Sequence, residues 1–143
     1  MKALLQLLCA ASISLLALGA SAEQAKQLGD LKVHYSAFNS TFLQPEIAAA
    51  SGLVRGKQTG VLNIAVQKEA KPVAGIISGE VKNLLSQVQP LTFKEIREGE
   101  ALYYLAQFTF DKRETLSFTV RVQGIGDDAV QQFTFTQEFF AAE

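Results

Sequence analysis

The sequence predicts an all-β domain, a two-sheet antiparallel sandwich of the immunoglobulin-like kind with one short helical turn. Apolar and polar residues alternate along much of the chain, which is typical of strands with one buried face. Clusters of Gly, Asp and other polar residues separate these segments at short intervals, and short links favour antiparallel neighbours. About seven strands at this spacing favour two packed sheets over a closed barrel.

A signal peptide is predicted for residues 1–22. Lys2 supplies a positive charge, an apolar run extends to Leu18, and Ala20-Ser21-Ala22 forms a small-residue cleavage site. The apolar run is about sixteen residues long, shorter than the roughly twenty that cross a bilayer. We therefore expect an exported protein with no stable membrane span after cleavage.

Residues 23–143 remain after cleavage, and we expect them to form a single domain. This part has no cysteine, so apolar packing must stabilise it without disulfides. Its basic residues are scattered along a slightly acidic chain, so nucleic acid and anionic membranes are not expected partners. With His34 as the only histidine, the usual zinc, copper and iron–sulfur sites are excluded, and we expect no metal or cofactor.

The expected strands follow the alternation of apolar residues. In chain order they are residues 31–36, 61–66, 76–85, 91–96, 102–110, 116–123 and 133–136. Residues 102–110 are apolar on both faces, because Tyr103 and Leu105 lie on the face opposite the inward row, and this predicts a central strand. The phenylalanines of the last three strands lie on inward rows and are expected in the core. Turns are predicted at residues 98–100, 111–114 and 124–128.

The helical turn is predicted at residues 45–52. Pro45 starts it, the alanines that follow favour helix, and Gly52 ends it. A helix this short is not stable alone, so we expect Ile47 to pack onto the sheets.

Residues 34–45 contain the chain's histidine together with aromatic, hydroxyl and amide side chains. One interpretation makes them a wall of a ligand site, with His34 as acid, base or donor and Asn39 and Ser40 as polar contacts. The other places His34 toward solvent and lets Asn39 and Ser40 cap a turn. The candidate binding residues are His34, Tyr35, Phe38, Asn39, Ser40 and Glu46.

Catalytic residues are not assigned. Ser36 shares a strand face with His34 but not the geometry that a nucleophile and its base need, and no G-x-S-x-G motif exists. Tyr103 and Phe140 lie off the inward rows and are candidates for an exposed contact patch.

The same region carries a resemblance to a known family. The pattern resembles the small exported proteobacterial proteins grouped as the domain of unknown function numbered four-four-two-six, over essentially all of residues 23–143. The residues that carry it are His34-Tyr35, Ala37-Phe38-Asn39-Ser40, Phe42-Leu43, Pro45-Glu46, Gly52 and Leu62-Asn63-Ile64. The resemblance implies a sandwich-like β fold in the periplasm of a Gram-negative bacterium, and it brings no established activity.

These observations favour a non-enzymatic binding or accessory module. It would engage an envelope protein or component through residues 38–46 or through an open sheet edge, since an edge strand can accept a guest strand. Two alternatives stay open: binding of a small ligand or glycan near residues 34–46, and an envelope hydrolase that uses His34.

Overall fold

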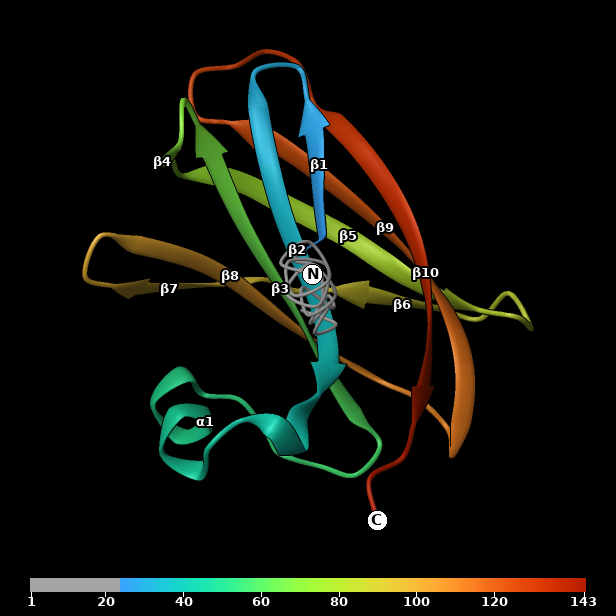
Figure 1. Ribbon diagram of the computed structural model, residues 1–143. Coiled ribbons are helices and arrows are strands. Elements are labelled where there is room, and N and C mark those ends of the chain that lie inside the picture. The colour runs from blue at the N-terminus through green and yellow to red at the C-terminus, as the bar shows by residue number, and fades with distance from the viewer. Residues whose placement is uncertain (1–23) are drawn as a thin grey trace, which may run out of the picture.

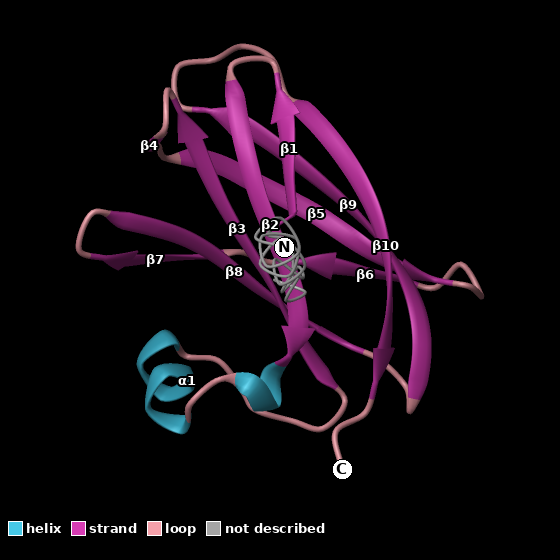
Figure 2. Ribbon diagram, viewed as in Figure 1, coloured by secondary structure: helices cyan, strands magenta, loops and turns pink. Residues whose placement is uncertain are grey.

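The computed structural model describes residues 24–143, so the predicted signal peptide lies outside the described residues. These residues form two antiparallel sheets that pack face to face, which confirms the predicted sandwich (Figures 1 and 2). Sheet A has the order β1-β2-β3-β8-β7, with β4 pairing on β3, and sheet B has the order β10-β9-β5-β6.

The strands of sheet A are β1 (Gln24–Leu28), β2 (Leu31–Asn39), β3 (Thr59–Lys68), β4 (Lys71–Pro72), β7 (Lys94–Glu98) and β8 (Ala101–Thr109). Those of sheet B are β5 (Gly75–Asn83), β6 (Val88–Leu91), β9 (Arg113–Gly124) and β10 (Gln131–Phe140). A 3-10 turn η1 (Ser40–Phe42) and a helix α1 (Pro45–Ser51) connect β2 to β3.

The strand count exceeds the expected seven for local reasons. Residues 91–96 do not form one strand, because the chain leaves sheet B after Leu91 and enters sheet A at Lys94. Strand β5 ends at Asn83, so the last two residues of the expected strand 76–85 lie in a turn. Strand β1 was not predicted, because its side chains are mostly exposed and show no alternation.

Aromatic side chains from both sheets fill the core. Tyr35 of sheet A packs against Phe133 and Phe135 of sheet B, with ring centroids 5.1 and 4.6 Å away. Phe108 of sheet A lies 5.0 Å from both Phe118 and Phe139 of sheet B. Such tilted and edge-to-face contacts add to the free energy gained by burying the rings. The chain therefore joins its two sheets without a covalent link.

Helix α1 begins and ends as predicted, with Pro45 in its first turn and Gly52 in the left-handed conformation at its end. The expectation for Ile47 is wrong, because this side chain is 49% exposed. Its neighbour Ala48 is buried instead, together with Leu53, Val61 and Leu105. Successive helical residues point about 100° apart, so a short helix buries a narrow side, and here that side is centred on Ala48.

Gly60 makes room for Phe108 in the core. A Cβ at residue 60 would lie 2.2 Å from the tip of the Phe108 ring, which is buried among other rings and has little freedom to move. We predict that Gly60→Ala lowers the free energy of unfolding by about 1–3 kcal/mol, measured by denaturant titration. In a Phe108→Leu background the same substitution should cost less, and an equal cost in both backgrounds would contradict this account.

Candidate binding groove

Strand β2 has a partner on only one side over its last residues. Strand β1 pairs with it from Leu28 opposite Leu31 to Gln24 opposite Tyr35, whereas β3 pairs with it as far as Asn39. Within residues 24–143, no strand continues β1 beyond Tyr35. Strand β10, at the edge of sheet B, also pairs on one side. Among the described residues, two strand edges without a neighbouring strand therefore lie on the same side of the sandwich.

A hollow of about 430 Å³ lies between these two edges. Its lining comes from Ala37, Phe38 and Asn39 of β2, from Thr41 and Phe42 of η1, and from residues 137–142. We call it the β2–β10 groove. Phe42 and Phe140 are 80% and 59% exposed, and Glu138 is the one charged residue that residues 24–143 contribute to its lining. Apolar side chains exposed together in a hollow are typical of binding sites.

Hydrogen bonds across the groove hold its two sides in place. Gln137 Nε2 donates to the carbonyl oxygen of Ala37 at 2.9 Å, and Asn39 Nδ2 donates to that of Phe140 at 3.4 Å. The backbone N–H of Ala142 donates to the carbonyl oxygen of Lys57 at 2.9 Å. The end of the chain is thereby attached to the loop that follows α1.

Asn39 and Ser40 organise the loop beside the groove. Asn39 Oδ1 accepts from the backbone N–H and hydroxyl of Thr41, at 3.0 and 2.8 Å, and Asn39 Nδ2 also donates to the carbonyl oxygen of Lys57. Ser40 is fully buried, and its Oγ both donates to the carbonyl oxygen of Gly56 and accepts from the Gly56 N–H. These bonds match the turn-capping interpretation and place both residues in the framework of the groove.

The candidate binding residues do not converge on one site. Phe38 and Asn39 line the groove, whereas Tyr35 is buried in the core between the sheets. Glu46 is exposed in the first turn of α1 and does not line the groove. His34 lies on the outer face of sheet A, where its Nε2 is 3.0 Å from Oε1 of Gln67. His34 and Tyr35 alternate along β2, so they point to opposite faces.

A second, smaller hollow of about 70 Å³ surrounds His34 on the outer face of sheet A. Ser36, Asn63 and Tyr103 also line it, and the buried Oδ1 of Asn63 has no hydrogen-bond partner. Among residues 24–143, the side chains that line this hollow include no carboxylate. Tyr103, expected on an exposed patch, is partly covered in this hollow.

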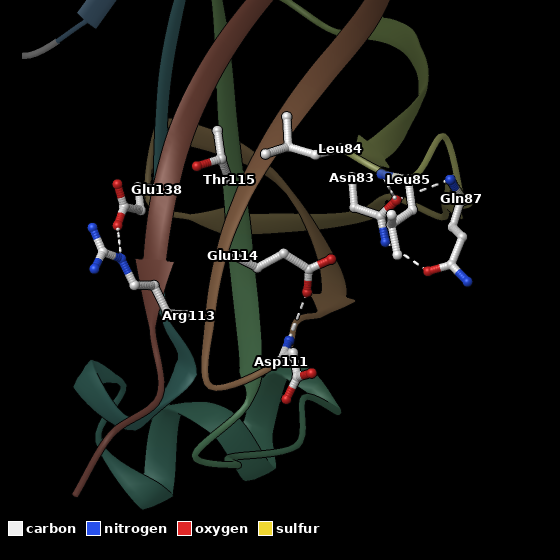
Figure 3. Close-up of a pocket in the computed structure, with 9 residues that line it drawn as sticks. All are labelled: Asn83, Leu84, Leu85, Gln87, Asp111, Arg113, Glu114, Thr115 and Glu138. Atoms are coloured by element: carbon white, nitrogen blue, oxygen red, sulfur yellow. Dashed lines mark hydrogen bonds and ion pairs between the residues drawn. The ribbon is translucent and has the colours of Figure 1, made fainter.

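A third hollow, of about 480 Å³, lies beside the turn between β5 and β6 (Figure 3). Leu84 and Leu85 line one side, and Asp111, Arg113, Glu114 and Glu138 contribute charges. We call it the leucine hollow. The sequence did not predict it, because residues 84–85 read as the end of a strand and residues 111–114 as an ordinary turn.

Ion pairs that shift pKa values lie outside all three hollows. Arg121 donates to Glu80 at 2.7 Å and lowers the pKa of that carboxyl, and Lys68, 3.0 Å from Asp30, lowers the pKa of Asp30. In residues 24–143, no group of three or more His, Cys, Asp and Glu side chains is placed to hold a metal ion. The same part of the chain contains no helix long and apolar enough to span a membrane.

The fold and the groove define a β-sandwich domain with an incompletely paired edge. The chain belongs to the DUF4426 family, a domain of unknown function, whose family model matches residues 25–142. It is similar to a crystal structure of a DUF4426 family protein from Pseudomonas aeruginosa PAO1, with 45% identity and a TM-score of 0.79 over 87% of this chain and 99% of that chain. The resemblance read from residues 34–64 is confirmed. No curated protein matches the sequence.

More distant structures share the fold alone. FetP from uropathogenic E. coli strain F11, expressed in the periplasm of E. coli BL21(DE3), has 10% identity and a TM-score of 0.58 over 84% of this chain and 95% of that chain. A copper-bound E46Q variant of FetP has 13% identity and a TM-score of 0.57 over the same shares of the two chains. A likeness at this identity shows the fold alone, so the copper binding of that variant is not inferred for the present chain.

We predict that Asn39→Ala lowers the free energy of unfolding by about 1–3 kcal/mol, because it leaves the backbone N–H of Thr41 and two carbonyl oxygens without their partner. Hydrogen exchange should also quicken in residues 40–56 and near the end of β10. The matched control is Ser36→Ala, an exposed position on the same strand, which should change stability little. Equal effects of the two variants would show that Asn39 does not organise the groove.

Proposed function

We propose that the protein is a non-enzymatic binding module of the periplasm, which holds an extended apolar segment of an envelope protein in the β2–β10 groove. The observation that carries the proposal is the coincidence of an unpaired strand edge with two exposed phenylalanines, Phe42 and Phe140. An unpaired edge supplies main-chain hydrogen bonds to a guest, and a neighbouring apolar hollow selects its side chains.

The geometry of β2 sets the direction of the guest. A guest that continues β1 lies antiparallel to residues 36–39 of β2 and runs the same way as β1. Its backbone would meet Ala37, whose carbonyl oxygen faces β10 and accepts from Gln137. In a strand, the N–H and C=O of one residue point to the same side, so the Ala37 N–H is available to the guest.

The composition of the groove sets the chemistry of the guest. Alternate side chains of the guest point inward and would contact Ala37, Phe139 and the exposed rings of Phe42 and Phe140. Aromatic side chains at the centre of an interface commonly dominate its binding energy. A guest with apolar residues at every second position therefore fits best.

The periplasmic location rests on the leader pattern at residues 1–22, with Ala20-Ser21-Ala22 before the cleavage point. Such a location places envelope proteins within reach of the groove.

Small-ligand binding is a second candidate, favoured by the unpartnered Oδ1 of Asn63 in the hollow beside His34. A buried acceptor without a donor is costly, and a ligand hydroxyl or a water molecule would satisfy it. The volume of about 70 Å³ admits a group of that size and not a sugar ring.

A peptide library displayed on phage, selected on the protein that begins at Glu23, tests the proposal. We predict enrichment of peptides with alternating apolar residues. Phe42→Ser and Phe140→Ser should each weaken their binding at least tenfold, as expected for the loss of a central aromatic contact. The control is Ile125→Ser, which changes a side chain that is 68% exposed in the turn between β9 and β10, at the far end of the sandwich. Equal weakening by all three variants, or failure to select any binder, would contradict the proposal.

A further inference from the structure

The turn between β5 and β6 presents two leucines to solvent. Leu84 and Leu85 are both 80% exposed, although leucine is among the residues most often buried. Hydrogen bonds of the Asn83 side chain stabilise the turn around them. Asn83 Oδ1 accepts from the backbone N–H groups of Leu85 and Gln87 at 3.0 and 2.9 Å, and Asn83 Nδ2 donates to the side chain of Gln87 at 2.7 Å.

This network holds the two leucines in place, so they have little freedom to fold back onto the sheets. Two apolar side chains held together on a rigid turn keep unfavourable contact with water until a partner covers them. The turn therefore offers Leu84 and Leu85 as an apolar contact surface for a partner.

The other side of the leucine hollow carries more negative than positive charge. Three carboxylates line it, those of Asp111, Glu114 and Glu138, against the single guanidinium of Arg113. Arg113 is already paired with Glu138. Figure 3 shows the Glu114 carboxylate between Leu84 and Asp111, where one of its oxygens accepts from the Asp111 N–H at 2.7 Å. The hollow thus has an apolar side and a side with excess negative charge.

The leucine hollow continues the β2–β10 groove. Glu138 lines both of them. The Arg113 guanidinium lies 5.4 Å from the centre of the Phe140 ring. Arg113 lines the leucine hollow and Phe140 lines the groove, so the two hollows are in contact. Both contacts are at the end of β10 next to Asn39, and an antiparallel guest reaches this end with its N-terminal residues.

We propose that the guest carries a lysine or arginine next to an apolar residue on the N-terminal side of its groove-binding strand, and that the leucine hollow binds this pair. The apolar residue packs against Leu84 and Leu85, and the cation pairs with Glu114 and Asp111. This inference rests on the proposed strand-binding function and names the chemistry of the partner segment.

The test uses three versions of one peptide selected for groove binding. The first carries Lys-Leu at its N-terminal end, the second carries the same pair at its C-terminal end, and the third has norleucine in place of lysine. We expect the first to bind about threefold to fivefold more tightly than the third at low salt, as for a partly exposed ion pair, and to lose this advantage at high salt. It should bind more tightly than the second at either salt, because only a pair at the N-terminal end reaches the leucine hollow. Titration calorimetry measures the three affinities.

Variants of the protein identify the hollow as the source of this preference. Glu114→Gln keeps an acceptor for the Asp111 N–H, removes the charge, and should abolish the advantage of the first peptide over the third. The double variant Leu84→Ser/Leu85→Ser should weaken the first and third peptides, which both keep the N-terminal leucine, and leave the second almost unchanged. The control Glu98→Gln removes an exposed carboxylate on β7 and should have no effect beyond a small change in net charge.

Two different failures are distinguishable. Equal affinities of the three peptides, with binding still lost in Phe42→Ser, would overturn this inference and leave the strand-binding function intact. Absence of any binding that depends on Phe42 and Phe140 would overturn both.

Discussion

The packing of Tyr35 from sheet A against Phe133 and Phe135 from sheet B is the contact on which the β2–β10 groove depends. It joins β2 to β10 in the core, so it determines how far apart these two strands lie. No disulfide shares this role, because residues 23–143 contain no cysteine. The groove is therefore a direct consequence of aromatic packing between the sheets.

The groove also depends on where β1 stops pairing. Proteins usually protect exposed strand edges with charges, proline or bulges. Here the last four residues of β2 carry no such device, and β10 carries one acidic residue, Glu138, in ten. Side-chain amides occupy part of this space instead, since Gln137 and Asn39 each donate across the groove to a backbone carbonyl. A guest strand would replace or extend these contacts, which is compatible with reversible binding.

The sequence predicted the sandwich, the inward rows and helix α1, because alternation and local turn chemistry encode them. It did not predict the groove, since this site brings together residues about one hundred positions apart, such as Ala37 and Gln137. Two of the candidate binding residues also lie on opposite faces of sheet A. His34 and Tyr35 are neighbours on a strand, and the alternation that identified the strand already sends them to opposite faces. Phe42 is the residue that could have indicated the groove from the sequence. It lies in a polar loop before Pro45, where a large apolar side chain belongs to no inward row of a strand.

The proposed function requires a guest strand to pair with residues 36–39 of β2, on the side where β1 no longer pairs. Amide hydrogen exchange at Ala37, followed by NMR in the protein that begins at Glu23, tests it most directly. The account predicts fast exchange at Ala37 in the free protein and a slowing of at least tenfold when a guest peptide is bound, while Leu62 in the central strand β3 stays protected in both states. Protection of Ala37 before any peptide is added, or exchange that a bound peptide leaves unchanged, would contradict it.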